Sequence, residues 1–478
     1  MSITATDCAE GSLDLQPTIR LHDWLCDRAA QDCPEVSEVC REIRQTVHRR
    51  SIWFERQREL PLALSAVVLT EADIGHLRSL SERLHGLIEL ALDWTLDDPQ
   101  RLSRFFPDHR RIAPYFRRTP GLDFWQGYSR YDAVITADGT VRFIEANTCC
   151  PAGFLHAPDA SEILLQSFSQ LEMPWAAGRW RIGTLERDIL VDRLLSLERR
   201  GAPNRKGVIA LLNDENSLTN EVEMLRTALE RRGRDVVVAG ADELERCGRS
   251  VCWRDRPISL SWNKIRVSTP DSPNHCWKTG FEQRYAAFLS GLRDQAFVSV
   301  NNLVAATLAE DKGLLALFYH PEFRQQLDAH QKAFIDRHVL WTARLENGAV
   351  DYQGRTIDLL PFVRQHRERF VIKPANEGRG FGVLVGKFCD QQQWQQACQP
   401  NATLPCVVQQ YAPPLTLPVL TEVDSPVRKL CVRSMQLTLA MGMIEGTYRG
   451  LFSRVASGPV TNVGKAGMLQ AVFIDQRQ

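Results

Sequence analysis

Neither sign of charge dominates this sequence, because its 58 lysine and arginine side chains are matched by 58 aspartate and glutamate side chains. A chain with no formal net charge has no overall basic field to attract nucleic acid or an anionic membrane. No apolar run is long enough to span a bilayer. The first residues, MSITATDCAEGSLDLQ, lack the apolar segment of a signal peptide. We therefore expect a cytoplasmic protein without nucleic-acid or membrane partners.

Common metal and nucleotide signatures are also missing. The thirteen cysteines form no Cys-x-x-Cys pair, and the eleven histidines form no zinc-protease cluster. This argues against structural disulfides and against a zinc site. There is no Walker A motif, and no G-x-G-x-x-G follows the first predicted parallel strand. We expect Cys149 and Cys150 to be small buried side chains, with a redox or nucleophilic role as the alternative.

The most informative stretch is residues 130–147. Asp138-Gly139 predicts a two-residue hairpin turn, because both residue types tolerate positive φ, and the flanking residues favour strands. A turn at this place puts Asp132 directly opposite Glu145 on one face of the hairpin. Two carboxylates about 5 Å apart repel by about 3 kcal/mol at an effective dielectric near 20. A sheet built for stability alone would avoid that pairing.

The same register places Arg130 opposite Asn147, so four polar side chains share one face. Carboxylate and amide oxygens suit Mg²⁺, which keeps few protein ligands and takes the others from phosphates and water. The hairpin therefore indicates a magnesium site. The alternative interpretation is a surface hairpin with scattered polar side chains, one carboxylate being protonated or paired with Arg130.

With Pro-Ala-Gly at 151–153 after it, the hairpin resembles the metal-binding end of ATP-grasp ligases, of which D-alanine–D-alanine ligase is a familiar member. In that family the Asp and the Glu-x-Asn hold two Mg²⁺ ions against the ATP phosphates. The Arg before the Asp helps to stabilise the transition state. The resemblance implies that Asp132, Glu145 and Asn147 are metal ligands and that Arg130 is a catalytic cation.

The motif stands early in this chain, whereas an ordinary ATP-grasp sequence has it last. This order resembles the circularly permuted ATP-grasp branch, which includes glutathionylspermidine synthetase-like ligases. The implied fold combines α+β and α/β parts. They are a helical N-terminal region (1–125), the permuted metal-binding part (126–200), a small doubly wound α/β domain (201–320), and a nucleotide-binding part with the remaining β-rich core (321–478).

Hydrophobic periodicity predicts the other elements. Residues 1–125 read mostly as helix, with helices at 34–50 and around 74–89. Asp159 is the expected start of a later helix, and residues 185–200 read as the next. The strand–helix–strand order of 207–239 predicts a small parallel α/β domain. Further strands are expected at 259–263, 297–300, 370–374, 383–385, 406–411, 429–433, 435–439 and 446–449.

Lys373 ends a predicted strand, and a glycine-rich loop follows it. Glycines let backbone N–H groups approach phosphate closely, and the lysine adds a point charge. This arrangement resembles the strand–loop–strand of ATP-grasp proteins. The alternative is an ordinary glycine-rich hairpin with an exposed lysine.

Three weaker resemblances accompany this loop. Asp311-Lys312 resembles the Asp-Lys motif of the family, and residues 406–411 resemble its adenine-contacting hinge, although the family usually has Glu where Gln409 stands. Arg454, followed by Asn462 and Gly464, resembles the Arg…Asn…Gly stretch that ends permuted ATP-grasp proteins, which implies a second catalytic cation. The alternative for Arg433 and Arg454 is a solvated strand face. The implied nucleotide-binding residues are Lys312, Lys373, Glu377, Gly378, Gly380, Gly382, Gln409, Gln410, Tyr411 and Arg433.

The resemblance implies a carboxylate–amine ligase that uses ATP and Mg²⁺ and forms an amide or peptide bond through an acyl phosphate. Its small-molecule partners would be a carboxylate and an amine, drawn from amino acids, peptides or polyamines, and a homodimer is compatible with the sequence. Two other functions stay open. One is an ATP-grasp phosphotransferase, which needs a catalytic histidine such as His156 or His338. The other is a non-catalytic nucleotide-binding or scaffold protein.

Overall fold

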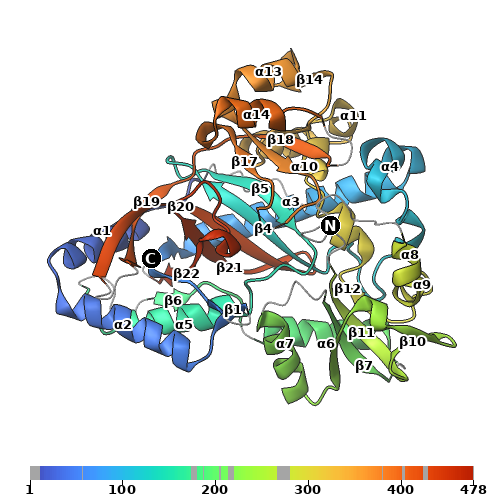
Figure 1. Ribbon diagram of the computed structural model, residues 1–478, viewed down its shortest axis with the longest axis horizontal. Coiled ribbons are helices and arrows are strands. Elements are labelled where there is room, and N and C mark those ends of the chain that lie inside the picture. Colours follow the sequence, from blue (N-terminus) through green and yellow to red (C-terminus); the bar gives the residue numbers. More distant parts are fainter. Residues whose placement is uncertain are drawn as a thin grey trace.

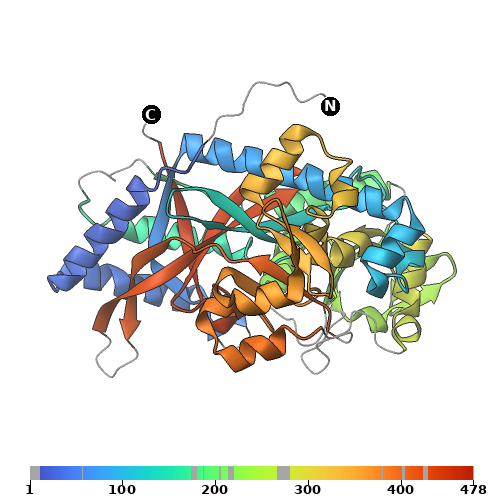
Figure 2. The same ribbon diagram turned by 90° about the horizontal axis from the view of Figure 1, so that it is seen from above.

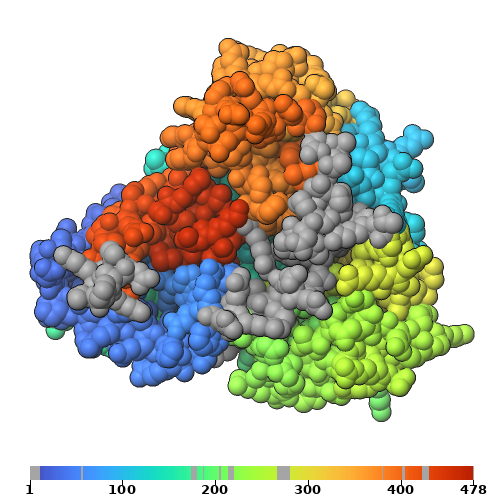
Figure 3. Space-filling view, in the orientation of Figure 1, coloured from blue at the N-terminus to red at the C-terminus, as the bar shows by residue number. Residues whose placement is uncertain are grey.

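The computed structural model describes residues 11–55, 58–173, 180–186, 188–203, 206–213, 220–265, 280–378, 380–400, 404–423 and 429–476. Within these ranges, no helix has both the length and the apolarity needed to cross a membrane. Figure 3 shows three lobes, formed by the green, the orange, and the red with dark-blue parts of the chain.

An eight-stranded mixed sheet joins the two ends of the chain (Figure 1). Its strands run in the order β3-β22-β21-β20-β4-β5, with β19 paired to β20 and β6 paired to β22. The bounds are β3 (Leu62–Thr70), β4 (Tyr128–Ile135), β5 (Val141–Asn147), β6 (Trp180–Ile182), β19 (Thr416–Val423), β20 (Lys429–Ile444), β21 (Thr447–Ala456) and β22 (Met468–Asp475). The hairpin β4–β5 thus pairs with the C-terminal strands through β4 and β20, as we expected.

The hairpin turn differs from the two-residue turn that we expected. Thr136 and Thr140 close it, because the Thr136 amide donates to the Thr140 carbonyl at 3.0 Å and three residues lie between them. Only the last of the three, Gly139, has positive φ, at 80°. A Cβ there would lie 2.7 Å from the Leu13 carbonyl oxygen, so the turn needs glycine.

A β-bulge then restores the predicted pairing at the far end of the hairpin. Near the turn Ala133 pairs with Phe143, but Asp132 pairs with Glu145, so Ile144 is an extra residue in β5. The predicted pairs of Asp132 with Glu145 and of Arg130 with Asn147 are confirmed. Without this extra residue, the register set near the turn would shift both pairs by one residue.

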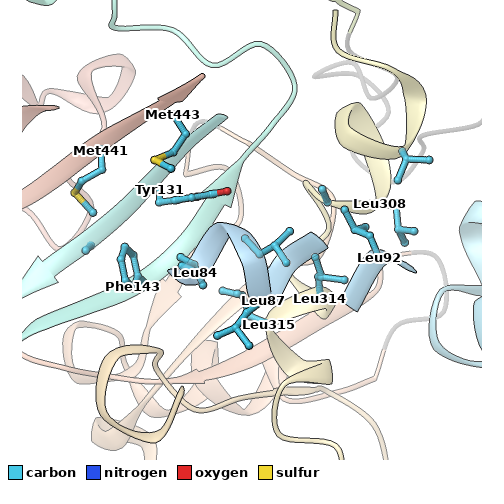
Figure 4. Close-up of a cluster of buried hydrophobic side chains, with 14 of the residues drawn as sticks. Leu84, Leu87, Leu92, Tyr131, Phe143, Leu308, Leu314, Leu315, Met441 and Met443 are labelled. Carbon is cyan, nitrogen blue, oxygen red and sulfur yellow. The ribbon is translucent and has the colours of Figure 1, made fainter. Parts of the chain in front are cut away.

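The long helix α3 (Glu71–Leu96) covers the back of this sheet (Figure 2). It begins with a capping box, in which the Thr70 hydroxyl and the Asp73 carboxylate satisfy each other's backbone amides. Its apolar face packs against the side of β4 and β5 that carries Tyr131 and Phe143, together with Met441 of β20 (Figure 4). Because side chains alternate along β4, Arg130 and Asp132 face the opposite side.

The region before residue 125 is less uniformly helical than expected, since β3 lies within it and pairs in parallel with β22. The helix predicted at 34–50 is confirmed as α2 (Pro34–Arg49). Helices α2 and α5 pack on the other side of the sheet. The other elements before residue 125 are α1 (Gln16–Ala30), α2 (Pro34–Arg49), β1 (Trp53–Glu55), β2 (Arg58–Glu59) and α4 (Pro99–Phe105), and α5 (His156–Phe168) follows the hairpin. Helix α5 begins at His156, three residues before the expected start.

The predicted parallel α/β unit is present. Strands β8-β7-β11-β12 are parallel, and a hairpin of β9 and β10 extends the sheet. Apolar residues of β7 alternate between two cores, so helices cover both faces of the sheet. The bounds are α6 (Ile189–Gly201), β7 (Val208–Asn213), α7 (Asn220–Arg231), β8 (Val236–Ala239), β9 (Glu245–Cys247), β10 (Ser250–Trp253), β11 (Arg256–Lys264), α8 (Phe281–Arg284), α9 (Ala286–Arg293) and β12 (Val298–Val300).

A third unit, orange in Figure 1, carries the glycine-rich loop on a four-stranded sheet in the order β13-β18-β16-β17. Its bounds are α10 (Gly313–Leu317), α11 (Pro321–Arg324), α12 (Ala329–His338), β13 (Thr342–Arg344), β14 (Ala349–Tyr352), β15 (Arg355–Asp358), α13 (Leu359–Gln365), β16 (Phe370–Pro374), β17 (Leu384–Val385), α14 (Gln391–Ala397) and β18 (Cys406–Gln410). After it, the two strands predicted at 429–433 and 435–439 are one continuous strand, β20.

Asn301, directly after β12, fastens the α/β unit to the hairpin. Its Oδ1 accepts the amides of Gly127 and Tyr128 at 3.1 and 3.0 Å. Its Nδ2 donates to the carbonyls of Tyr128 and Thr148, both at 2.6 Å. One buried amide therefore holds the start of β4 and the segment just after β5.

Replacing Asn301 by Ala should lower the free energy of unfolding by about 3 kcal/mol, because each buried backbone group left unsatisfied costs about 1–3 kcal/mol. Urea denaturation measures this change. The exposed Asn347 provides the matched control, whose replacement by Ala should shift stability by less than about 0.5 kcal/mol. An equal, small change in both variants would contradict the fastening role.

Candidate active site

Two adjoining pockets meet at the open end of the β4–β5 hairpin. The lysine pocket is lined by Ile144, Glu145, Lys312, Lys373, Gln409 and Tyr411, among others. The histidine pocket is lined by Arg130, Asn147, His156, Glu221, Lys264 and Glu310, among others. Glu145, Arg454 and Asn462 line both. The lysine pocket has about 820 Å³ of space, counting its open mouth, which suits a small-molecule ligand.

Asp132 lies beneath the junction of the pockets with no exposed surface. Arg130 donates to both of its oxygens, from Nε at 2.8 Å and from Nη2 at 3.0 Å. Arg454 reaches the same carboxylate from β21, with Nη2 2.7 Å from Oδ2. Asn147 Nδ2 also donates to Oδ2 at 3.0 Å. The carboxylate is therefore surrounded by donors.

These charges decide the ionisation of the cluster. Burial alone would raise the pKa of the Asp132 carboxyl, but the charges of Arg130 and Arg454 outweigh it and hold that pKa well below its usual value. Burial would lower the pKa of Arg130, yet Asp132 raises it above the ordinary arginine value. The repulsion expected between Asp132 and Glu145 is thus offset by two guanidinium groups.

Glu145 and Asn147 are the hairpin residues that bring a carboxylate and an amide to the pockets. The Glu145 side chain keeps 26% of its surface exposed, and its Oε2 lies 3.9 Å from Lys312 Nζ. Asn147 Nδ2 donates to Asp132. The Asn147 Oδ1 atom therefore points away from Asp132 and can accept a hydrogen bond or bind a cation. These two side chains therefore bring a carboxylate and an amide oxygen from the hairpin to the pocket walls.

The bulge at Ile144 connects the hairpin to the third unit. Lys373 Nζ donates to the Ile144 carbonyl at 3.3 Å and to Gln409 Oε1 at 2.7 Å. Gln409 Nε2 also donates to the Ile144 carbonyl, at 3.2 Å. Burial lowers the pKa of Lys373 to about 8. Gln409 is thus a buried partner of the lysine, a role that the hinge resemblance did not give it.

Lys312 and the glycine-rich loop close the other side of the lysine pocket. Lys312 Nζ donates to the Glu377 carbonyl at 2.6 Å. Lys465 Nζ donates to the Gly380 carbonyl at 2.6 Å, which ties the loop to the C-terminal strands. Glu377 and Gly380 line the lysine pocket, and Gly378 lines the histidine pocket.

The remaining predicted residues divide into two groups. Gln410 and Tyr411 line the lysine pocket, where the Tyr411 amide donates to the Arg369 carbonyl at 2.8 Å. Gly382 has positive φ and packs against Pro374, outside the described lining of both pockets. Arg433 is exposed on β20 opposite Val419 of β19, so the structure does not bring it to the junction.

Asp311, beside Lys312, is a structural anchor. Its Oδ1 accepts the Gly313 amide at 2.7 Å, and its Oδ2 lies 3.1 Å from His109 Nε2 and 3.7 Å from Arg344 Nη2. Burial would raise its pKa, but Arg344 and His109 lower it to about 2. The charged Asp311 therefore holds the start of α10, and with it Lys312, between His109 and Arg344 of β13.

Sequence reasoning missed a group of residues around the segment that follows β5. Glu310 accepts the amides of Thr148 and Cys149. Glu221, from α7, accepts the amides of Gly153 and Leu155, both at 2.8 Å. It also accepts the amide of His156 at 3.3 Å, so it caps the N-terminus of α5. These contacts join segments far apart in sequence, so no local pattern announces them.

Three of the four cysteines and histidines singled out earlier line the histidine pocket. Cys150 is buried, as expected, and its thiol donates to the Val300 carbonyl. Cys149 is half-buried, where we expected it to be buried, and both cysteines line the histidine pocket. His156 lines it too, whereas His338 is bonded to the Val141 carbonyl at 3.0 Å and lines neither described pocket.

The hairpin offers few free oxygen ligands for a divalent cation. In the part of the chain that the structure describes, no group of three or more His, Cys, Asp or Glu side chains is placed to hold a metal. Asp132 is occupied by Arg130, Arg454 and Asn147. Glu145 and Asn147 offer one carboxylate and one amide oxygen, which is enough for an ion that completes its shell with phosphate and water.

Comparison with known proteins supports the fold. No protein-family model and no curated protein matches the chain. The solved structure of a glutathione synthetase-like effector from Globodera pallida, in its apo form, matches with a TM-score of 0.57 and 10% identity, covering 91% of this chain and 96% of that one. A provisionally named gamma-glutamylcysteine synthetase from Methylobacillus flagellatus KT has a TM-score of 0.38 and 13% identity, covering 83% and 87%.

The second of these scores is too low to support an argument. The first shows that this chain has a mixed α/β fold similar to that of a glutathione synthetase-like protein, and at 10% identity it shows the fold alone.

Replacing Asp132 by Asn should lower the free energy of unfolding at pH 7 by about 3–5 kcal/mol, because two buried guanidinium groups lose their counter-charge. Folding lowers the pKa of Asp132, so its stabilisation is present above the unfolded pKa, near 3.9, and is lost as pH falls.

The difference between wild type and this variant should therefore shrink below about pH 4. Urea denaturation across pH measures it, and the exposed Asp351, changed to Asn, is the control. A constant difference from pH 7 to pH 3 would refute the charge-based role.

Proposed function

We propose that the chain is an ATP-dependent carboxylate–amine ligase that forms an amide bond through an acyl phosphate. The observation that carries this proposal is the junction at Glu145. There, a pocket with two lysines and a glycine-rich loop meets a second pocket with polar and apolar walls. A reaction that first activates a carboxylate with ATP and then transfers it to an amine needs two such adjoining sites.

The lysine pocket would hold the nucleotide. Lys312 and Lys373 supply two cations beside Glu145, and backbone amides of the loop around Gly380 can approach the phosphates closely. Gln410, the last residue of β18, and Tyr411, directly after it, line the same pocket. The base of the nucleotide would lie against them. The lowered pKa of Lys373 reflects its burial, which a bound phosphate would counteract by favouring the charged form.

Glu145 and Asn147 would hold Mg²⁺, which when bound neutralises charge on the transferred phosphoryl group. The carboxylate of Asp132 orients Arg130 and Arg454 through charge-assisted hydrogen bonds. In this proposal Asp132 serves the arginines, and the ligand role that the family resemblance gave it passes to its neighbours on β5.

The acid substrate would lie in the histidine pocket with its carboxylate toward Glu145 and the ATP γ-phosphate. Attack by a carboxylate oxygen on the γ-phosphorus would give an acyl phosphate and ADP. An amine would then attack the acyl carbon, and phosphate would leave. Arg454 lines both pockets, so it can stay beside the transferred group in both steps. Fixed cations of this kind stabilise developing negative charge without reorganising.

The permuted arrangement of the chain is part of the proposal. The hairpin with Glu145 precedes both lysines in sequence, yet it pairs with β20, which follows them. The site is therefore completed by a strand pairing between segments far apart in sequence, as a circularly permuted ATP-grasp core would need.

Mg·ATP should stabilise the wild-type protein, since a ligand at about 100 times its Kd adds about 2.7 kcal/mol to the folded state. The Glu145→Gln variant should lose most of that magnesium-dependent gain. Thermal unfolding with ATP, with and without Mg²⁺, measures the effect. The exposed Glu346, changed to Gln, is the control and should respond like wild type. No stabilisation of wild type at millimolar Mg·ATP would sink the proposed function.

Hydroxylamine should trap the acyl phosphate as a hydroxamate. We expect ADP and a ferric-coloured hydroxamate when wild type is given Mg·ATP, hydroxylamine and a pool of the twenty amino acids with mixed dipeptides, with hydroxamate and amide together equal to the ADP released. Loss of Lys373, as Lys373→Met, should abolish both products by weakening nucleotide binding. ADP release without hydroxamate would argue against a ligase and for phosphoryl transfer to another acceptor.

A further inference from the structure

His156 is a buried side chain without hydrogen bonds in the wall of the histidine pocket. Only 3% of the residue is exposed. Neither Nδ1 nor Nε2 has a hydrogen-bond partner in the described part of the chain. Buried polar atoms are normally paired, so an imidazole with two unpaired nitrogens beside a ligand-sized pocket calls for an explanation.

The proposed reaction, on which this inference rests, needs a group that takes a proton. An amine becomes positively charged when its lone pair forms the bond to the acyl carbon, and the product amide is neutral. One proton must therefore leave the nitrogen during the step, and a base that is not already occupied must be close by.

The carboxylates around the pocket are occupied. Asp132 is surrounded by two guanidinium groups, and Glu145 lies beside Lys312 and would bind the metal. Glu310 accepts two backbone amides, and Glu221 accepts three at the start of α5. Each of these carboxylates would lose the charge that strengthens its present contacts by taking a proton.

The surroundings of His156 keep its lone pair available. Burial lowers its pKa, against the raising effects of Glu221 and Asp159, and Lys264 lowers it further. The imidazole is therefore neutral at pH 7, with one nitrogen that can accept a proton. Its place at the N-terminus of α5 also disfavours a positive charge on the ring.

We infer that His156 is a catalytic residue, the general base that accepts the proton of the attacking amine in the histidine pocket. The amine nitrogen forms its bond to the acyl carbon, and the carbon–oxygen bond to phosphate breaks. The proton passes from that nitrogen to the free imidazole nitrogen and then to the departing phosphate or to solvent. The products are amide and inorganic phosphate, and His156 returns to its neutral form.

The test compares two nucleophiles in wild type and in His156→Gln, which keeps polarity and approximate size but cannot act as a base. With Mg·ATP and the pool of amino acids and dipeptides, ADP release by the variant should fall by about 10²-fold or more. With hydroxylamine added, which is weakly basic and largely unprotonated at pH 7, hydroxamate formation should stay at the wild-type rate. His338→Gln, a buried histidine lining neither described pocket, is the matched control and should change neither rate.

Several results would overturn the assignment. Equal losses with both nucleophiles would mean that His156 only supports the structure, and no loss would mean that it is not the base. An imidazolium at pH 7, seen in ¹⁵N spectra of histidine-labelled protein with His156→Gln for assignment, would exclude it. Phosphohistidine at position 156 would make it a phosphoryl acceptor instead.

If wild type binds Mg·ATP but gives no ADP with either nucleophile, the ligase function fails and the role of His156 fails with it. If wild type turns over and His156→Gln is unaffected, the ligase function stands and only the inference about His156 falls. The two failures are thus distinguishable by the wild-type measurement alone.

Discussion

The ion cluster of Asp132 with Arg130 and Arg454 is the constraint on which the site depends. A buried carboxylate between two guanidinium groups is stable only when every partner is present, since the loss of one leaves an uncompensated charge. Arg130 and Asp132 come from β4 and Arg454 from β21, on the two sides of β20. The cluster therefore also requires the pairing of β4 with β20. Glu145 and Asn147, which pair with Asp132 and Arg130 and line the pockets, take their positions from this buried arrangement.

The pairing of Asp132 with Glu145 was predictable from sequence, whereas the turn and the bulge that together set it were not. The assumed turn was wrong, and the bulge at Ile144 corrected the register. A signal of that bulge was present. Val141 and Phe143 are apolar and belong in the core, whereas Glu145 is polar, although all three stand at alternate positions of one strand. Alternate residues of a regular strand lie on one face, so it cannot place the apolar pair in the core and Glu145 on the opposite face. The sequence pattern therefore indicates an extra residue, a bulge, between Phe143 and Glu145.

The lysines and their loop were predictable for a different reason. Lys373 and the following glycines form a local strand–loop–strand pattern, and the structure brings Lys373 and Lys312 into one pocket. What could not be predicted depends on contacts over long sequence distances. Asn301, Glu221 and Glu310 each satisfy backbone groups more than sixty residues away. A lone Asn or Glu has no pattern that names its partner. Arg433 shows the converse, because a cation on a strand looks the same whether it faces a site or water.

The bulge at Ile144 also means that the hairpin consists of two segments of opposite phase. Between the turn and Ile144, odd-numbered residues of β5 face the core, and beyond it they face the pockets. A single-residue deletion in β5 before the bulge would therefore exchange the inward and outward positions of one segment while leaving most of the sequence intact. A two-residue change would preserve the phase. Length variation in this hairpin, among chains that keep the same site, should accordingly come in even steps.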